Sequence, residues 1–334
     1  MGILVGLLLL AVLILWLGAV WSLDRGRSHT AAANELPLRD VRNGPANGLV
    51  RVQAADLEFR ARVRNLDGAG EAVILLHGFP QTSACWEPAI DALAAAGYRV
   101  IAYDQRGYSP GARPLGVDAY RIDRLASDVA AVADTLGFER FHLVGHDWGA
   151  AVGWAVAMTR PERLLSWSAL SIGHSFAFRD AVRGDADQRK RSRYILLFRL
   201  PVLPEWLLAW GRFRVLRKVM YHCMPPAHVR EYLSAFAEPG ALTAILNYYR
   251  AMGDSGGLDP TPGVAVPTLY IWGNRDPAAG RTAAEGTAPF MQGPYVYSEI
   301  DAGHWLLETR TEPVVDQLVD HIVSCSGTPP ANAG

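Results

Sequence analysis

Three side chains of this sequence have the types needed for nucleophilic catalysis, and they occur in the order carboxylate, carboxylate, histidine. Asp147 is the middle residue of GHDWG at positions 145–149, which has the G-x-S-x-G form of a nucleophile elbow with Asp in place of Ser. Asp276 follows the apolar run 267–272, and His304 stands in a glycine-flanked loop. In a parallel α/β sheet, side chains that directly follow strands meet at one edge. The order and placement therefore predict a triad with Asp147 as the nucleophile.

An aspartate at the elbow restricts the chemistry. A carboxylate that attacks an amide or ester would give a high-energy anhydride, whereas attack on an sp3 carbon with a leaving group gives an alkyl ester on the enzyme. His304 would then activate water against that ester, and Asp276 would orient the imidazole. We expect the backbone N–H groups of Phe79 and Trp148 to hold the oxyanion of this second step.

Strand-like and helix-like segments alternate along the chain. Apolar runs and period-two alternation predict strands at 50–52, 57–61, 72–76, 98–103, 141–144, 165–170, 267–272 and 295–300. Helical patterns occur at 90–96, 122–136, 150–158 and 313–322. This alternation predicts an α/β fold with a mostly parallel sheet. Asp104 stands at the end of the predicted strand 98–103, and we expect it to brace a loop through Arg106.

The alternation is interrupted from Gly173 to about Leu258, where the sequence is rich in Arg, Leu, Trp and Tyr and has a helical pattern throughout. A helical cap inserted into one α/β domain explains this interruption. We divide the chain into a transmembrane anchor (1–24), a linker (25–48), the first part of the core (49–172), the cap (173–258), the second part of the core (259–326) and a disordered tail (327–334).

The N-terminal segment 3–23 carries no charged residue. About 20 apolar residues suffice to cross a bilayer as a helix, so the segment predicts a single-pass, uncleaved membrane anchor. Arg25, Arg27, Arg39 and Arg42 follow it and no Lys or Arg precedes it. The positive-inside rule therefore predicts that the catalytic domain is cytoplasmic.

Composition excludes several other classes of protein. The 334 residues carry a net charge of −1, which gives no electrostatic footprint for nucleic acid. The three cysteines are widely spaced and match no zinc or disulfide framework. The histidines have no metal-ligand spacing either, so we expect neither a metal nor a cofactor.

Four motifs resemble those of the epoxide hydrolases in the α/β-hydrolase superfamily. They are HGFP at 77–80, YDQRGYS at 103–109, GHDWG at 145–149 and AGHW at 302–305. The similarity extends from about residue 50 to residue 324 and is closest to the membrane-anchored members. The resemblance implies an α/β-hydrolase fold and hydrolysis of a small-molecule epoxide to a vicinal diol.

The resemblance also implies two cap tyrosines that contact the epoxide oxygen. The first is Tyr194, in a stretch where Arg199 replaces the family's Gln, and the second is Tyr249, the latter tyrosine of NYYR at 247–250. Opening an epoxide leaves a strongly basic alkoxide, and a phenol with a pKa near 10 can give it a proton. The aromatic residues Trp206, Trp210, Phe213 and Phe236 suggest that the substrate is apolar.

Two alternatives stay open. A haloalkane or haloacetate dehalogenase would use the same triad, but such enzymes usually have Asn where Phe79 stands, or Arg where Trp148 stands. A non-catalytic binding protein could share the fold, because fold alone does not determine activity. All five catalytic positions hold competent residues, which disfavours this second alternative.

Other polar residues receive structural interpretations. We expect His77 and His146, which flank the elbow and the HGFP motif, to be scaffold. The basic run 189–193 is interpreted as a solvated helix face, with contact to anionic lipid headgroups as the alternative.

Overall fold

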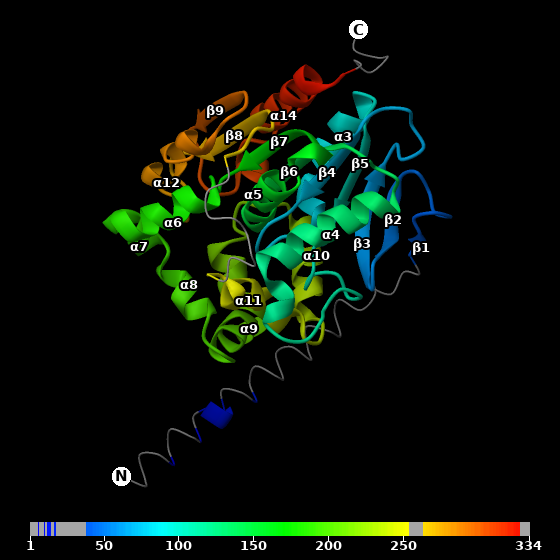
Figure 1. The fold of residues 1–334 in the computed structure, drawn as a ribbon. Coiled ribbons are helices and arrows are strands. Elements are labelled where there is room, and N and C mark those ends of the chain that lie inside the picture. The colour runs from blue at the N-terminus through cyan, green and yellow to red at the C-terminus, as the bar shows by residue number, and fades with distance from the viewer. Residues whose placement is uncertain are drawn as a thin grey trace.

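The computed structural model describes residues 6, 10, 12–14, 17, 38–253 and 263–327. Within these residues nine strands form a single sheet in the order β1-β2-β3-β5-β4-β6-β7-β8-β9 (Figure 1). The strands are β1 (Arg39–Asp40), β2 (Gly48–Ala54), β3 (Leu57–Arg64), β4 (Ala72–Leu76), β5 (Arg99–Tyr103), β6 (Phe141–His146), β7 (Leu164–Leu170), β8 (Thr268–Gly273) and β9 (Tyr295–Ile300). From β5 to β9 all neighbouring strands are parallel, whereas β3 pairs antiparallel with both β2 and β5.

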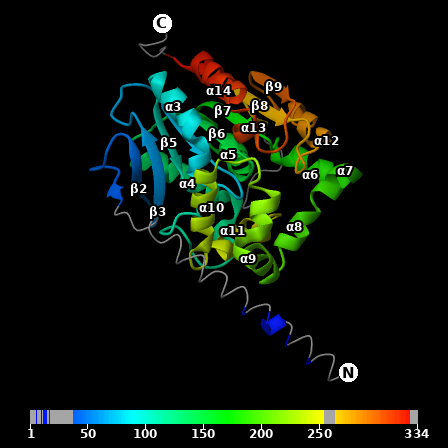
Figure 2. The same cartoon turned by 180° about the vertical axis from the view of Figure 1, so that it is seen from behind.

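Helices cover both faces of the sheet, which is why its central strands are almost wholly apolar. Every residue of β4, β6 and β8 is buried. The covering helices are α3 (Glu87–Ala95), α4 (Ile122–Thr135), α5 (Trp148–Thr159) and α14 (Thr311–Cys325). Helices α4 and α5 pack together on one face, and α3 and α14 pack together on the other (Figures 1 and 2).

Among the described residues, six helices lie between β7 and β8. They are α6 (Ser175–Gly184), α7 (Ala186–Arg191), α8 (Arg193–Phe198), α9 (Leu203–Val219), α10 (Pro226–Ala237) and α11 (Ala241–Ala251). The first, α6, packs against α5 and against α12 (Arg281–Glu285). Helix α11 packs against α8, α9 and α10, and Figure 1 shows these four helices together at one end of the sheet. We call helices α7 to α11 the cap.

The predicted α/β fold with a mostly parallel sheet is confirmed, and each predicted strand and helix overlaps an observed one. Most of the predicted anchor and of the linker, residues 254–262 and the tail from 328 onward lie outside the described residues. Among the residues that the structure does describe, no helix has the length and apolar character needed to span a membrane.

Candidate active site

The sheet register brings the predicted site residues together at one edge. Leu76 at the end of β4 pairs with Gly145 of β6, so the loop that starts at His77 lies beside the elbow. On the other side, His146 at the end of β6 pairs with Leu170, the last residue of β7. The next strands continue this alignment through β8 to β9. The residues directly after these strand ends therefore converge, as the spacing in the sequence predicted.

Asp147 occupies a sharp turn between the end of β6 and the start of α5. Its φ of 52° lies in the left-handed region, which is unusual for a residue other than glycine. The two motif glycines make this turn sterically possible. A Cβ at Gly145 would lie 2.3 Å from the carbonyl oxygen of Gly149, and a Cβ at Gly149 would lie 2.1 Å from that of Leu76. The G-x-D-x-G spacing is thus a packing requirement of the elbow.

The two oxygens of the Asp147 carboxylate have different surroundings. Oδ1 accepts a 2.7 Å hydrogen bond from the backbone N–H of Phe79. Oδ2 lies 3.5 Å from Nε2 of His304. Trp148 begins α5, so its backbone N–H has no carbonyl partner within the helix and faces the same turn. One oxygen is therefore held by a backbone donor, while the other faces the histidine.

His304 is held from behind by Asp276 and by Ser171, which the sequence analysis did not identify. Nδ1 of His304 lies 2.9 Å from Oδ2 of Asp276 and 2.8 Å from the hydroxyl oxygen of Ser171. Ser171 also donates a 2.6 Å hydrogen bond to the same carboxylate oxygen. Oδ1 of Asp276 accepts from the backbone N–H groups of Ala278 and Ala279. Ser171 directly follows a predicted strand, so its position carried the same signal as the other three.

Electrostatics make His304 an unusually strong base as long as the Asp147 carboxylate keeps its negative charge. Burial alone would lower the pKa of His304, but the charge of Asp276 and the contacts with Asp147 raise it from 6.5 to about 10. Burial alone would likewise raise the pKa of Asp276, but the charge of His304 and the hydrogen bonds from His304, Ser171 and Ala278 hold it below its ordinary value. In the resting protein, His304 is therefore an imidazolium between two carboxylates.

The two predicted tyrosines lie on different cap helices and face the elbow. Tyr249 on α11 is buried, with its ring centroid 5.1 Å from that of Trp148 and 6.1 Å from that of Tyr194 on α8. The pKa of Tyr249 is raised by burial, then by its neighbour Tyr194 and by the charge of Asp147, against a hydrogen bond from Trp148 that lowers it. Burial and the charges of Asp147 and Asp276 raise the pKa of Tyr194. Both phenols therefore stay protonated at neutral pH.

The aromatic residues taken as a sign of an apolar pocket separate into two groups. The ring of Phe236 lies 6.1 Å from that of Phe79, and Phe213 packs behind Phe236 at 6.5 Å. Trp210 is instead 45% exposed and stacks edge-on against Trp206. Only Phe236, with Phe213 behind it, lies against the wall of the site. Trp206 and Trp210 therefore do not support the prediction of an apolar substrate.

His77 and His146 contact backbone next to the site. Nε2 of His77 accepts from the backbone N–H of Gln105 at 3.0 Å. Nε2 of His146 lies 2.9 Å from the carbonyl oxygen of His304, and its Nδ1 lies 3.1 Å from the side-chain oxygen of Gln81. Burial, with the charge of His304, lowers the pKa of His146 to about 4, so this ring is neutral. These contacts fit the scaffold role expected for both histidines.

Asp104 does not brace its loop through Arg106, and this prediction is wrong. Arg106 pairs with Asp128 on α4 at 2.6 Å. Asp104 pairs instead with Arg60 at 2.5 Å, because β5 lies beside β3 in the sheet. Its other oxygen accepts from the backbone N–H of Ser83 at 2.8 Å. Neighbours across the sheet, rather than neighbours in sequence, decide this pairing.

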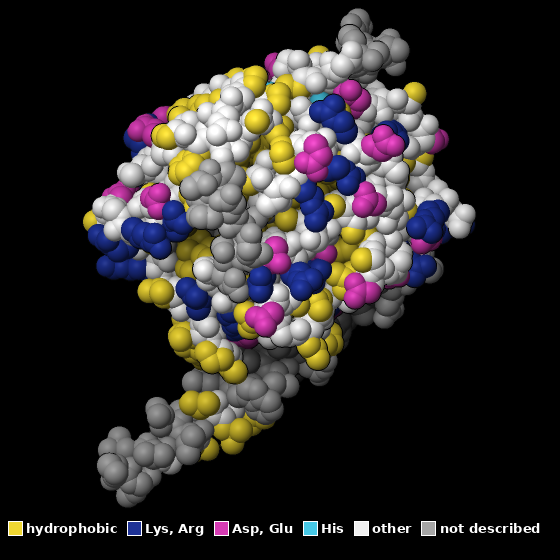
Figure 3. Space-filling model, viewed as in Figure 1, with side chains coloured by type: hydrophobic (Ala, Val, Ile, Leu, Met, Phe, Trp, Pro, Cys, Tyr) yellow, Lys and Arg dark blue, Asp and Glu magenta, His cyan; other side chains and the backbone are white. Residues whose placement is uncertain are grey.

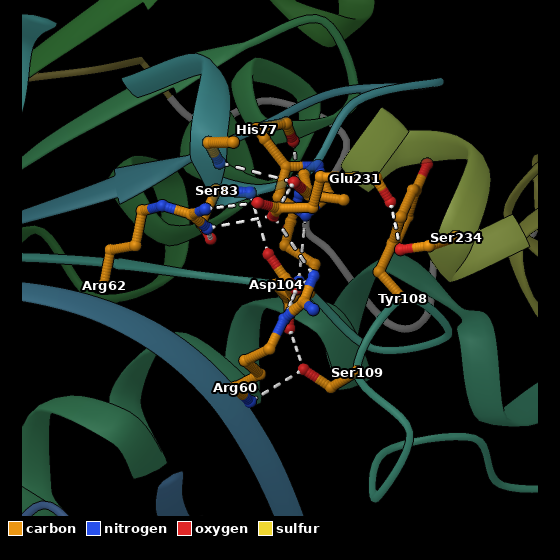
Figure 4. A network of polar contacts seen from close by, with 12 residues as sticks. Arg60, Arg62, His77, Ser83, Asp104, Tyr108, Ser109, Glu231 and Ser234 are labelled. Carbon is orange, nitrogen blue, oxygen red and sulfur yellow. Dashed lines mark hydrogen bonds and ion pairs between the residues drawn. The ribbon is translucent and has the colours of Figure 1, made fainter. Parts of the chain in front are cut away.

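The Asp104–Arg60 pair belongs to a larger group of charges, which we call the cap–core cluster: Arg60, Arg62, Asp104 and Glu231 (Figure 4). Glu231 comes from cap helix α10, and both arginines come from β3 of the core. The Glu231 carboxylate accepts from both arginines and, at 2.8 Å, from the hydroxyl of Thr82. The cap–core cluster thus ties the cap to the core beside the loop that carries Phe79.

In the described part of the chain no group of three His, Cys, Asp or Glu side chains is placed to hold a metal ion. Cys85, Cys223 and Cys325 are free thiols.

This chain is similar in sequence to a known protein family and to several known proteins. The family model described as "alpha/beta hydrolase fold" matches residues 71–311. The AB hydrolase superfamily protein YfhM of Bacillus subtilis is 37% identical over 75% of this chain and 89% of its own length. Epoxide hydrolase A of Mycobacterium tuberculosis is 32% identical over 75% of this chain and 89% of its own length.

Solved structures of epoxide hydrolases also match this chain. A Bacillus megaterium epoxide hydrolase bound to an inhibitor superimposes with a TM-score of 0.73 at 25% identity, covering 81% of this chain and 99% of that one. The match includes the sheet and therefore confirms the predicted α/β-hydrolase fold. The chain belongs to the epoxide hydrolase family of the α/β-hydrolase superfamily, and it is a hydrolase.

Proposed function

We propose that this protein hydrolyses an apolar epoxide to a vicinal diol through an ester formed on Asp147. One observation carries the proposal: the Asp147 carboxylate lies between a backbone donor and His304, with two protonated tyrosines from the cap facing it. Related proteins named as epoxide hydrolases support the substrate class. The proposed reaction uses no cofactor.

In the first step, Oδ2 of Asp147 attacks one epoxide carbon and the carbon–oxygen bond of the ring breaks. The released oxygen takes a proton from Tyr249, with Tyr194 as the second hydrogen-bond donor. The raised pKa of Tyr249 keeps its phenol protonated, so its O–H is available for the substrate. Oδ1 becomes the carbonyl oxygen of the ester and keeps its bond from Phe79.

In the second step, His304 takes a proton from water and the hydroxide attacks the ester carbonyl. The resting imidazolium cannot do this, but formation of the ester removes the negative charge of Asp147. Two of the causes that raise the pKa of His304 are then lost, so its pKa falls towards neutrality. The proton that His304 releases returns to the Tyr249 phenolate left by the first step, which restores the phenol and makes His304 a neutral base. The N–H groups of Phe79 and Trp148 hold the oxyanion, and its collapse releases the diol and regenerates Asp147.

The surroundings of Asp147 favour an epoxide over a halide. The aromatic ring of Phe79 cannot donate a hydrogen bond, and it packs against Phe198 and Tyr249. The Trp148 side chain, which would be a halide donor in a dehalogenase, packs edge-on against the ring of Tyr249 with the centroids 5.1 Å apart. A departing halide also needs no proton, which would leave the tyrosines without a role.

A single turnover in ¹⁸O-labelled water tests the mechanism. With enzyme in excess over a styrene-type epoxide, the diol should be unlabelled and the label should enter the peptide that contains Asp147. Repeated turnover should then label the diol. A diol labelled in the first turnover would show direct attack by water and contradict the proposal. The variant His304→Gln should accumulate the ester, visible as a mass increase equal to that of the epoxide.

A membrane location is also a proposal. It rests on the uncharged segment 3–23 and on the four arginines that follow it, which favour a single-pass anchor with the catalytic domain in the cytoplasm. Extraction from membranes by detergent but not by alkaline carbonate tests the anchor, and protease protection of the C-terminal domain in sealed vesicles tests the orientation.

A further inference from the structure

Exposed large apolar side chains are concentrated on one surface of the cap. In the ranges 38–253 and 263–327, seven of the ten exposed ones lie between residues 196 and 215. They are Leu196, Leu197, Leu200, Val202, Leu203, Trp210 and Val215. Leu196 is 66% exposed and Val202 is 60% exposed. Single exposed apolar residues are normal on a protein surface, but a cluster of this kind marks an interaction site.

The same segment is strongly basic. Residues 189–218 contain seven Arg and two Lys but only one acidic residue, Glu205. The segment therefore carries +8 although the whole chain carries −1, which leaves −9 for the remaining residues. Within the part of the chain that the structure describes, Lys190, Arg193 and Arg199 form no ion pair with a carboxylate. Their charges are available to an anionic partner.

Apolar and basic side chains share one surface of helices α8 and α9. Figure 3 shows hydrophobic side chains at the lower left of the folded part, over these helices, with Lys and Arg side chains beside them. We call this surface, formed by residues 189–218, the basic–apolar face. Its helices also depart from regular geometry: α9 is interrupted at Trp210, and Arg212 and Phe213 have positive φ. The interruption leaves Trp210 on the outer surface.

This combination fits a lipid bilayer better than another macromolecule. Leu, Val and Trp side chains that enter the headgroup–acyl boundary, together with flanking Lys and Arg, are what interfacial helices present to anionic membranes. Nucleic acid would use the charges but gain nothing from exposed leucines. A protein partner of ordinary composition would leave most of the excess cations unmatched. The uncharged segment 3–23 of the same chain adds a second element with membrane chemistry.

We infer that the basic–apolar face of the cap docks on the surface of an anionic lipid bilayer. The docked surface is directly behind the site, because α8 presents Leu196 and Leu197 outward while Tyr194 of the same helix faces Tyr249. An epoxide dissolved in the bilayer would then meet the cap before it meets bulk water. This last consequence rests on the proposed function, whereas the docking itself does not.

The test places an environment-sensitive fluorophore on the full chain. Leu196→Cys is labelled in a background that carries Cys223→Ser and Cys325→Ser, since Cys85 is buried. The matched control is Val296→Cys on β9, an apolar residue that is 55% exposed on another part of the surface. The protein is reconstituted in vesicles of phosphatidylcholine alone or with about 30% phosphatidylserine, and quenching by spin-labelled lipid is measured.

Docking predicts strong quenching at position 196 and little at position 296. Phosphatidylserine should increase the quenching at 196, and about 0.5 M salt should reduce it, because screening weakens the attraction of exposed charges. The double variant Arg193→Glu, Arg199→Glu should lower the quenching at 196 to the level of the control. Circular dichroism and turnover of a small water-soluble epoxide should be unchanged in this variant.

Three results would overturn the inference. Equal quenching at 196 and 296 would mean that the anchor alone places the domain near lipid without preference. Quenching at 196 that changes neither with phosphatidylserine nor with the charge reversals would exclude an electrostatic docking surface. Shielding of 196 that depends on protein concentration and not on lipid would identify a second copy of the chain as the partner. Failure of epoxide turnover in every variant would count against the proposed function and leave the docking result intact.

Discussion

Two buried groups of charge lie at the same edge of the sheet and differ in their balance. The cap–core cluster has two arginines and two carboxylates, and each of its ion pairs is 3.3 Å or shorter. The triad has two carboxylates and one imidazolium, and its nucleophile lies 3.5 Å from His304. The cap–core cluster is matched in charge, whereas the triad has one negative charge in excess. That excess lies on the group proposed to react.

The difference separates a structural use of charge from a chemical one. In the cap–core cluster each ion favours the charged form of its partner, and Arg60 is the first cause that lowers the pKa of buried Asp104, to about 2 against the effect of burial. Nothing in this cluster changes charge during the proposed reaction. In the triad, ester formation neutralises Asp147 and thereby changes the proton affinity of His304. Mutations in the two groups should therefore separate stability from catalysis.

The largest effect is expected at the nucleophile. Asp147→Ala removes the group that forms the ester, and turnover of any epoxide substrate should fall by about 10⁴-fold or more. Stability should change little, because the substitution removes the residue that carries excess charge. Steady-state kinetics and thermal unfolding on the same preparation check both statements. More than about 1% residual activity would show that water can attack the epoxide directly.

A second, smaller loss of activity is expected at the cap tyrosines. Tyr249→Phe should lower kcat for an epoxide about 100-fold, since it removes the proton donor but not the nucleophile. Tyr248→Phe is the matched control, because the neighbouring Tyr248 hydroxyl donates to the carbonyl oxygen of Arg106 and has a structural role. The control should lose stability and keep kcat. Equal losses of kcat in both variants would argue against a specific role for Tyr249.

In the cap–core cluster we expect the opposite: a loss of stability with little change in kcat. Glu231→Gln leaves Arg60 and Arg62 without one of their carboxylate partners and should destabilise the fold by about 2–3 kcal/mol, discounted because the Glu231 side chain is 21% exposed. The kcat of the folded protein should change only a few-fold. The control Glu58→Gln breaks an exposed pair with Arg51 and should cost less than about 0.5 kcal/mol. Urea unfolding measures both, and a stable Glu231→Gln variant would contradict the assignment.

The proton affinity of His304 gives a direct measure of the excess charge. In Asp147→Asn the pKa of His304 should fall below its value of about 10, as it would on ester formation. Because the folded-state pKa lies above the unfolded value, protonation of His304 stabilises the wild type fully below about pH 6.5. That contribution is lost as the pH rises towards 10, and Asp147→Asn should lose it at a lower pH. NMR titration of the histidine ring checks the shift, and an unchanged pKa would remove the proposed trigger for the second step.

Spacing in the sequence predicted the residues at strand ends and missed the contacts made across the fold. Asp147, Asp276 and His304 each stand within four residues of the end of a predicted strand, and Ser171 could have been found by the same criterion. Glu231 could not, because a helix carboxylate looks solvent-facing in sequence and its arginine partners lie 171 and 169 residues away. Sequence proximity also misassigned Asp104 to Arg106. Long-range pairing depends on strand order and on where the cap rests, and neither is encoded in local patterns.

Glu308 lies just after the triad histidine and offers the smallest and most specific test of the buried charges. Its carboxylate contacts the side chain of Gln81, which contacts His146, which in turn contacts the carbonyl oxygen of His304. A neutral His146 has one N–H but faces two oxygens, so the chain of contacts lacks a donor. If the oxygen and nitrogen of the Gln81 side-chain amide exchange places, the amide N–H becomes the donor to His146. The Gln81 oxygen then faces Glu308, whose carboxyl group must carry a proton to donate to it. Burial raises the pKa of Glu308 to about 7, so the carboxyl group is protonated below neutral pH.

Because the folded-state pKa of Glu308 lies above its ordinary value of 4.5, the wild type should lose stability as the pH rises from about 4.5 to 7. Glu308→Gln keeps an N–H donor at every pH and cannot ionise. It should flatten this dependence and stabilise the fold at pH 8 by about 1–2 kcal/mol, less than the full shift implies because one buried polar group still needs a partner. Urea unfolding at pH 5 and pH 8 measures the difference. If the wild type and Glu308→Gln lose the same stability between pH 5 and pH 8, another group causes the pH dependence. The excess negative charge would then reside in the triad alone.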